Sequence, residues 1–382
     1  MTTKALLLNE TGKDIANALW SINARLTAED LTFKQMRDII VSGGAPKNFP
    51  EGTTFKTVKG DYTYLWMFMH NGNLSDGRPY SDVRVMEAVD IYQFDSAEAF
   101  YYCETTLSAG TYYFEVETTW YNAIAGNYKF TLPADIPAGS QLAGLDRIAD
   151  VGATGCSVKV YASAASTTPL YTLAITSGSG GTKLCTLRPA GDTNDENVNS
   201  IQRAGYGSNN YAQSAIRQYL NSDKAAGAYW TPKGKFDRPP SWNNSLIGFK
   251  AKLPDDFLDI VSPVKISTVT NNIFETDGYT ITSSYATDDM FWLPSRYQIF
   301  GSTEGSDLSE TQWNYYRDAT DVDRIMYDRN GTARAQWMRS PYVGGAISVR
   351  DVDTSGALSN GYAHNRSASS PACRIYARKA SE

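Results

Sequence analysis

The sequence predicts a multidomain α+β protein with N-terminal helices, an antiparallel β-sandwich and a C-terminal α+β domain. Its 382 residues are more than one domain usually needs. Apolar residues recur at helical spacing near the N-terminus, alternate with polar ones through the middle, and follow a mixed pattern afterwards. We place a helical oligomerisation or attachment segment, a sandwich, a linker and the last domain at residues 1–48, 49–188, 189–199 and 200–382.

Two helices are expected before residue 48. The first carries a two-heptad apolar seam, which can join copies of the chain if larger domains help, or can lie against the chain's own domain. Both readings stay open. The second helix runs from Thr32 to Val41, because Thr32 and Gln35 form a capping box and Gly43-Gly44 ends it. The seam consists of Ile15, Leu19, Ile22 and Leu26.

The middle of the chain alternates in short runs separated by Gly, Pro, Asn and Asp, as antiparallel sandwiches do. In TYYFEVE (111–117), Phe114 and Val116 share one face while Glu115 and Glu117 share the other. We interpret these two acids as a solvated face rather than a catalytic pair. The linker follows in a segment rich in Gly, Asn and Asp.

The last domain begins with helical patterns and continues with short strands. Helices are expected within 211–227, 253–264 and 309–319. The segments AISVRDVD and ALSNGYAHN flank the turn at 354–356 and predict a hairpin. Its alternating positions hold Ser, Arg, Asp, Asn and Tyr.

Composition argues against several classes of function. Lys and Arg number 35 against 41 Asp and Glu, a net charge of −6, which disfavours binding to nucleic acid or to an anionic membrane. An apolar run of four residues before Asn9 is too short for a signal peptide or a membrane span. We therefore expect that the chain does not insert into a membrane. We also expect that it is made in a bacterial cytoplasm and has no signal peptide.

The cysteines and histidines give no metal motif. Two histidines and four widely spaced cysteines without C-x-x-C argue against a structural zinc site, so plain buried thiols are expected. A Cys156–Cys185 bridge is the alternative. No P-loop, dinucleotide fingerprint or G-x-S-x-G motif is present either.

Paired carboxylates are the residues with which a glycan depolymerase would work. Asp255-Asp256 is better explained as the start of a helix, and Asp288-Asp289 as a turn before the apolar strand MFWLP. Asp321 could share a strand face with a second acid two residues on, but Arg317 and Arg324 nearby suggest surface ion pairs. Glycan hydrolysis is therefore only an alternative function.

Several segments after residue 200 together resemble the C-type-lectin-like domain of phage and prophage tail receptor-binding proteins, and of variable proteins of diversity-generating retroelements. Two upstream segments, LLLNETGKDIANAL and NFPEGTTFKT, resemble the front of such phage proteins, so the resemblance covers most of the chain. The C-terminal segments are IQR (201–203), YGSN (206–209), SAIRQYLNS (214–222), WTPKGKFDRPP (230–240), FWLPSRYQIFG (291–301), QWMRSP (336–341), TSGAL (354–358) and SPACRI (370–375).

The resemblance implies a lectin-like scaffold in 200–382 and a non-enzymatic adhesin. The expected partners are a bacterial surface protein or glycan and other virion tail proteins, in a homotrimer located in the virion tail. Variation in such proteins falls between the RSP motif and the closing strand, which implies an exposed, variable ligand patch. Its positions are Gly345, Ala346, Ile347, Ser348, Arg350, Asp353, Asn360, Tyr362, His364, Asn365 and Arg366.

The chain departs from the sugar-binding lectins of this fold, which bind through calcium with E-P-N or Q-P-D, because neither tripeptide occurs. We expect no cofactor, while a structural calcium ion held by Asp and Asn side chains stays open. Formylglycine-generating enzymes share the fold but need a cysteine pair, and Cys373 stands alone in the second half of this domain. The alternative to an adhesin is a structural virion or baseplate protein.

Overall fold

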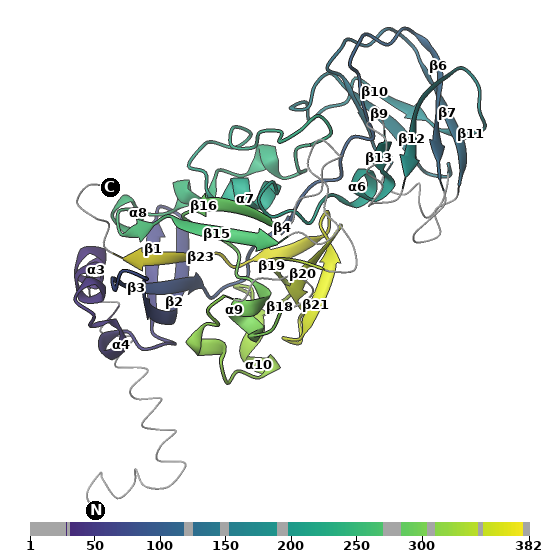
Figure 1. Cartoon of the computed structure of the whole chain (residues 1–382). Coiled ribbons are helices and arrows are strands. Elements are labelled where there is room, and N and C mark those ends of the chain that lie inside the picture. Colours follow the sequence, from purple (N-terminus) through teal and green to yellow (C-terminus); the bar gives the residue numbers. More distant parts are fainter. Residues whose placement is uncertain are drawn as a thin grey trace, which may run out of the picture.

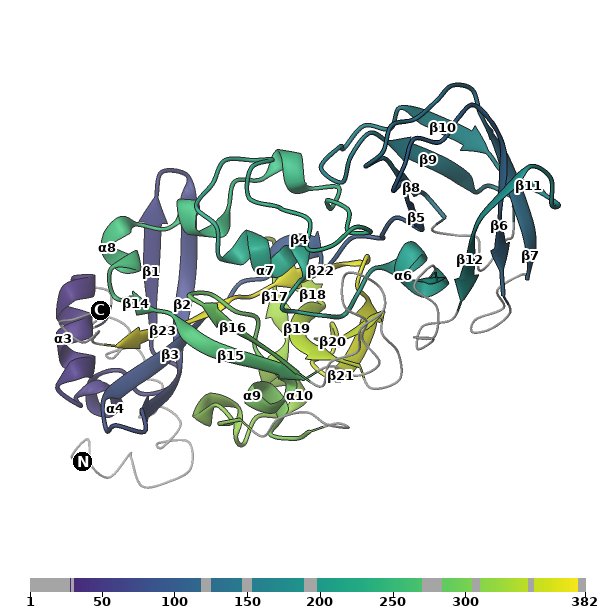
Figure 2. The ribbon, with the colours of Figure 1, turned by 45° about the horizontal axis from the view of Figure 1, so that its top comes forward.

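The protein is a mixed α+β structure in which strands predominate. Figure 1 shows a larger lobe, which contains the first and last described elements, and a smaller lobe of strands at one end of the molecule. Figure 2 shows α6 (Ile201–Tyr206) and the segment between β4 (Val89–Gln93) and β5 (Tyr101–Tyr102) at the junction of the two. The computed structural model describes residues 28, 31–117, 125–145, 153–188, 198–269, 284–303, 310–342 and 347–376.

The larger lobe contains a sheet that joins distant parts of the chain, here called the terminal sheet. Strands β1, β2 and β3 come from the N-terminal part and pair antiparallel with one another, and β3 pairs antiparallel with β23 from the C-terminal part. Arg374 lies opposite Asp82, and its Nε donates to Oδ1 of Asp82 at 2.7 Å. The strand order is β1 (Thr54–Lys59), β2 (Tyr62–Asn73), β3 (Pro79–Val85), β23 (Ala372–Tyr376) and β14 (Val261–Ser262).

A second sheet of the larger lobe holds the predicted hairpin and is called the hairpin sheet. Its order is β21 (Leu358–Tyr362), β20 (Ser348–Val352), β19 (Gln336–Pro341), β22 (Arg366–Ser369) and β4 (Val89–Gln93). The hairpin β20–β21 turns at Thr354-Ser355-Gly356 and is confirmed. Two short ribbons complete the strands of this lobe: β15 (Val264–Val269) with β16 (Ser284–Asp289), and β17 (Met326–Tyr327) with β18 (Ala333–Arg334).

The smaller lobe is the sandwich, and its two sheets enclose a core of its own. One sheet has the order β10 (Tyr171–Ala174), β9 (Ser157–Tyr161), β8 (Gln141–Ala143) and β5 (Tyr101–Tyr102). The other has β11 (Thr176–Ser177), β7 (Gly126–Leu132), β6 (Gly110–Val116), β12 (Thr182–Arg188) and β13 (Val198–Ser200). On β6, Phe114 and Val116 are buried and Glu115 is partly exposed, as the alternation predicts.

The strand pairing corrects the expected domain limits. We expected one sandwich over 49–188, but β3 and β4 pair with C-terminal strands and β1 and β2 continue the sheet of β3, so the sandwich is an insertion between β4 and α6. Alternation shows that a segment is a strand without showing which strand it pairs with. The segment from residue 31 to 48 packs on the terminal sheet and is part of the larger lobe. Of the expected linker, residues 189–197 lie outside the described residues, and residues 198 and 199 begin β13.

The helices are short. The capping box that predicts α3 is confirmed: Oγ1 of Thr32 accepts from the N–H of Gln35 at 3.2 Å, and Oε1 of Gln35 accepts from the N–H of Thr32 at 2.9 Å. The seam from Ile15 to Leu26 lies outside the described residues. The helices are α3 (Phe33–Val41), α4 (Ala45–Asn48), α6 (Ile201–Tyr206), α7 (Ala215–Leu220), α8 (Asp255–Leu258), α9 (Arg296–Phe300) and α10 (Asp321–Arg324), with 3-10 turns η1 (Asn243–Ser245), η2 (Phe249–Lys252) and η3 (Asn314–Tyr316).

Two expected helices are shorter than the pattern predicts. The helix expected within 211–227 is only α7, because the side chain of Ser214 caps it and Asn221 ends it. The helix expected over 309–319 is only the 3-10 turn η3, because Trp313 before it is extended. Tertiary packing of large aromatic side chains outweighs the local pattern in both places.

Buried side chains hold the larger lobe together. Trp292 and Trp337 are fully buried in its core. Arg339 is buried too; its Nη1 donates to the carbonyl of Leu293 at 3.0 Å and its Nη2 to Glu310. The alternative of a Cys156–Cys185 bridge is wrong, because all four cysteines are reduced thiols that form no disulfide.

Candidate functional site

The predicted ligand patch is only partly exposed. Gly345 and Ala346 lie outside the described residues. Ile347 and Ser348 are buried, with 1% and 3% of their surface exposed, so neither can contact a ligand as predicted. The carbonyl of Ser348 accepts from Nδ2 of Asn209 at 3.0 Å, which ties this end of β20 to the segment after α6. These two positions are corrected from ligand contacts to core positions.

Two further patch residues shape the hairpin. Asp353 accepts from the backbone N–H groups of Ser355 at 2.8 Å and Ala357 at 3.0 Å, and hydrogen bonds, first of all from the Ser355 hydroxyl, lower its pKa. The guanidinium of Arg350 lies over the ring of Tyr342, 4.5 Å from its centroid. Asp353 therefore holds the turn, while Arg350 offers a partly exposed cation.

The remaining patch residues gather beside an aromatic cluster. Tyr206, Tyr362 and His364 form it: the ring of Tyr206 lies 4.6 Å from that of Tyr362 and 5.2 Å from that of His364. All three side chains are partly exposed. The N–H of His364 donates to the carbonyl of Tyr206 at 2.9 Å, so α6 and the hairpin sheet hold the cluster together. Asn360, Asn365 and Arg366 are exposed around it.

A cavity of about 550 Å³ opens next to this cluster, at the junction of the two lobes. His364 and Gln93 contribute from the larger lobe, and Lys159 and Tyr161 from β9 of the sandwich. Its volume is within the range of sites for small molecules. The predicted patch and the cavity thus share His364.

The loop formed by residues 230–240 of the larger lobe packs on the sandwich and closes one side of the cavity. On β9, Val158 and Val160 point into the sandwich core, so Lys159 and Tyr161 face outward, towards this loop. Nε2 of Gln141 donates to the carbonyl of Lys235 at 2.5 Å. Three hydrogen bonds of Gln141, to Lys235, Asp237 and Arg238, fix the loop against β8.

Arg238 is the main cation of that loop. Its guanidinium lies over the ring of Tyr161, 3.5 Å from the centroid, and Nη1 donates to Oε1 of Gln141 at 2.8 Å. It also donates to the carbonyls of Ser163 at 3.1 Å and Ala164 at 3.2 Å. Burial lowers the pKa of Arg238 to about 10, so it remains charged at neutral pH. Its donors are spent on building the cavity wall.

Three carboxyl groups surround one buried arginine behind the cavity. Nε of Arg203 lies 2.7 Å from Oε2 of Glu98, with 4% and 3% of the two side chains exposed. Burial raises the pKa of Asp95, Glu98 and Asp237, and repulsion from the neighbouring acids raises those of Asp95 and Asp237 further. For Asp237 the pKa reaches about 7. A backbone N–H, that of Lys233, donates to the Asp237 carboxylate at 2.7 Å.

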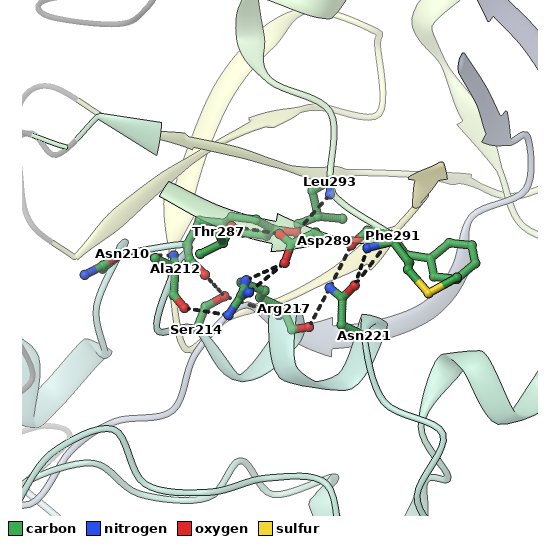
Figure 3. A network of polar contacts seen from close by, with 11 residues as sticks. Asn210, Ala212, Ser214, Arg217, Asn221, Thr287, Asp289, Phe291 and Leu293 are labelled. Carbon is green, nitrogen blue, oxygen red and sulfur yellow. Dashed lines mark hydrogen bonds and ion pairs between the residues drawn. The ribbon is translucent and has the colours of Figure 1, made fainter. Parts of the chain in front are cut away.

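The acid pairs considered for hydrolysis do not meet in a cleft. Asp288 is exposed and Asp289 is buried on β16, so the two lie on opposite faces, and the expected turn is wrong. Oδ1 of Asp289 accepts from Nε of Arg217 at 2.8 Å (Figure 3), and burial raises the pKa of Asp289. Asp255 begins α8 as expected, and its side chain is 89% exposed.

The third acid pair lies in a helix. Asp321 and Asp323 fall in the first turn of α10, so they share no strand face. Asp321 forms the expected surface ion pair with Arg324 at 3.0 Å, and Asp323 caps the helix through Thr320. Within the described ranges, no group of three or more His, Cys, Asp and Glu side chains is placed to hold a metal ion. No described helix is long and apolar enough to cross a membrane.

Residues 186–377 match the family described as Domain of unknown function (DUF6273). The chain belongs to this family. No curated protein and no solved structure matches it. The DUF6273 match contains β19–β23 and the loop 230–240, but β1–β4, which complete both sheets of the larger lobe, precede it. The DUF6273 region therefore shares its sheets with the N-terminal strands.

Sequence reasoning missed the sandwich side of the cavity. The alternation in SVKVY predicts that Lys159 faces outward, but nothing in the sequence indicates that this face contacts the loop 230–240. The only local indication of the loop is the run Phe236-Asp237-Arg238-Pro239-Pro240, because its two prolines restrict the backbone and predict a stiff segment. Tyr206 and Asp237 lie in segments that carry the resemblance, YGSN and WTPKGKFDRPP, but nothing in the sequence marked either residue as part of the site.

Proposed function

We propose that this protein binds a molecule on the surface of a host bacterium, as the receptor-binding component of a phage or prophage tail. The observation that carries the proposal is the cluster of Tyr206, Tyr362 and His364 beside the cavity. Aromatic side chains held by a sheet give contact area at low cost in conformational entropy, and neighbouring polar side chains add hydrogen bonds.

We also propose that the larger lobe is a C-type-lectin-like scaffold. Residues of the segments that carry the resemblance stabilise this lobe: Trp292 and Trp337 are buried in its core, and Arg339 donates to a carbonyl and to a carboxylate. These segments build the scaffold, while the hairpin between them presents Asn360 and Tyr362 at its surface. This division between fixed and exposed positions supports an adhesin.

The proposal assigns no catalytic step. The acid pairs Asp288-Asp289 and Asp255-Asp256 share no cleft, which favours binding over hydrolysis. Attachment through several copies, as in a homotrimer of the virion tail, would strengthen individually weak contacts through effective concentration. The N-terminal seam is the segment proposed to join the copies to one another and to other tail proteins.

Binding of the fluorescently labelled protein to a panel of gut bacteria tests the proposal. The test variant changes Asn360, Tyr362, His364 and Asn365 to Ala. The control variant carries Lys34→Ala with Asp38→Ala, two exposed residues of α3 at the far end of the larger lobe. Both variants leave the net charge unchanged, and circular dichroism checks that each is folded.

We expect strain-selective binding by the wild type and the control, and at least a tenfold loss in the test variant. Equal binding by the folded test variant would contradict the patch. Binding to no strain would favour the structural alternative, a virion or baseplate protein whose hairpin packs against neighbours.

A further inference from the structure

We propose that the cavity between the lobes binds a carboxylated sugar of a surface glycan, with Lys159 as the residue that selects the negative charge. This rests on the proposed host-surface function and names the class of ligand. The cavity is large enough for a monosaccharide, at about 550 Å³. Three observations support it: the charge of the lining, the chemistry of the walls and the way the walls are held.

The lining has one cation whose charge is not used within the fold. The ammonium group of Lys159 makes no ion pair and no hydrogen bond with any part of the chain that the structure describes, while its backbone pairs in the sheet with β8 and β10. Its stem lies beside Gly144, where an added Cβ would come 3.1 Å from Cγ of Lys159. An ammonium group in a cavity is a ready partner for one carboxylate, because a charged hydrogen bond there is stronger than one in open water.

The other charged lining residues already have partners within the protein. Glu98 lines the cavity but is 3% exposed, and its carboxylate lies 2.7 Å from the guanidinium of Arg203. Arg238 spends its donors on carbonyls of the sandwich and on Gln141. The available charge is thus a single positive one, which suits a carboxylate better than a phosphate, whose sites gather several cations or backbone donors.

The neutral part of the lining suits a sugar ring. Hydroxyl and amide groups of Ser241, Thr167 and Asn244 can each take up a further hydrogen bond as donor or acceptor. Pro239 and Pro240 supply apolar surface against which the C–H face of a sugar can lie. This mixture of apolar surface and a few polar groups is typical of small-molecule sites.

The two walls are fixed to each other, so the cavity is preformed. Nδ2 of Asn244 in the larger lobe donates to Oγ1 of Thr167 in the sandwich at 3.1 Å. The backbone N–H of Ala99 donates to the carbonyl of Phe236 at 2.8 Å across the same junction. A preformed cavity avoids the entropy cost of ordering its walls when a ligand binds.

Isothermal titration calorimetry of the full chain with free D-glucuronate and N-acetylneuraminate, and with neutral D-glucose and N-acetylglucosamine, tests the inference. We expect saturable binding of at least one acidic sugar and at least tenfold weaker binding of the neutral sugars. Lys159→Ala should weaken the acidic sugar at least tenfold, about 1.4 kcal/mol. Lys159→Arg should retain most of the binding. Lys129→Ala, which removes a similarly half-buried lysine of β7 in the same sandwich, should change nothing.

Equal binding of acidic and neutral sugars, full binding by the folded Lys159→Ala variant, or no binding of any of the four sugars would overturn the inference. Cell binding separates this failure from that of the proposed function. If Lys159→Ala binds cells like wild type while the four-alanine patch variant does not, the adhesin stands and the cavity site is rejected. If wild type binds no cells, the adhesin fails, and the sugar titration still decides the cavity.

Discussion

Arg203 and Glu98 form an ion pair at 2.7 Å with both side chains buried, at the point where the sandwich joins the larger lobe. Arg203 lies in α6, which follows the sandwich, and Glu98 lies in the segment that enters it. The pair therefore ties together the two crossings of the chain between the lobes. Because a buried charge without a partner is strongly unfavourable, removal of either side chain should lower the free energy of unfolding.

Glu98→Ala should lower the free energy of unfolding by about 3–5 kcal/mol, because it leaves the guanidinium of Arg203 buried without its closest carboxylate. Urea denaturation followed by tryptophan fluorescence measures the change. The exposed pair of Lys235 and Glu104, at 2.6 Å and also across the junction, is the matched control. Glu104→Ala should cost less than about 1 kcal/mol. A similar small loss for Glu98→Ala would show that Asp95 and Asp237 compensate Arg203 fully.

The pKa of Asp237 makes the junction sensitive to pH. The folded pKa of about 7 lies above the ordinary value of 3.8, so folding binds a proton between these two limits. The stabilisation is complete below about pH 4 and is lost as the pH rises through 7. Asp95 and Glu98, whose pKa values are also raised, act in the same direction.

Asp237→Asn should therefore raise the free energy of unfolding at pH 8 by about 2 kcal/mol, since one pKa unit corresponds to about 1.4 kcal/mol and the neighbouring acids share part of the shift. At pH 4.5 the same change should have little effect. Thermal denaturation at both pH values measures this. A variant that is destabilised equally at both would show that Asp237 is needed as a charged partner of Arg203.

Gly356 at the tip of the hairpin should tolerate no side chain. Its φ is +88°, and an added Cβ would lie 1.7 Å from the carbonyl oxygen of Asp321 in α10. Gly331, with φ of +75° and nothing within 4 Å, is the matched control. Gly331→Ala should cost about 1–2 kcal/mol from backbone strain alone. Gly356→Ala should cost at least about 1 kcal/mol more. Equal losses would mean that the turn moves away from α10 freely.

The thiols should differ sharply in reactivity. Burial raises the pKa of Cys103 and of Cys185 to about 12, and raises that of Cys373 as well. Cys156 is partly exposed. Because the thiolate is the reactive form, a disulfide reagent at pH 8 should modify Cys156 in the native protein and the others only on unfolding. Cys156→Ser should abolish the fast phase; a fast phase that remains would place another thiol at the surface.

The sequence predicts local structure well where one side chain decides it. Thr32 with Gln35 fixes the start of α3, and the turn at 354–356 fixes the hairpin. Trp292 and Trp337 stand in the segments FWLPS and QWMRS, which read as internal strands, and both are buried in the core. Each of these features depends on residues that are neighbours along the chain.

Features that depend on distant residues could not be predicted. The partner of β3 is β23, and nothing in the local pattern of either segment identifies the other. The resemblance implies that Ile347 and Ser348 belong to the patch, yet both are buried, and Ser348 is hydrogen-bonded to Asn209 in the segment after α6. The cavity is made by residues from both lobes, so only the placement of the insertion brings Lys159 near His364.

The insertion of the sandwich also dictates an order of assembly during synthesis. The sandwich strands follow one another within a single stretch of the chain and can fold while the ribosome is still making the larger lobe. The terminal sheet has to wait, because Asp82 and Arg374 are 292 residues apart. Until β23 emerges, the open edge of β3 is exposed in the nascent chain, and that edge is a template for pairing with other chains. Pairing of β23 with β3 then covers this edge in the folded protein.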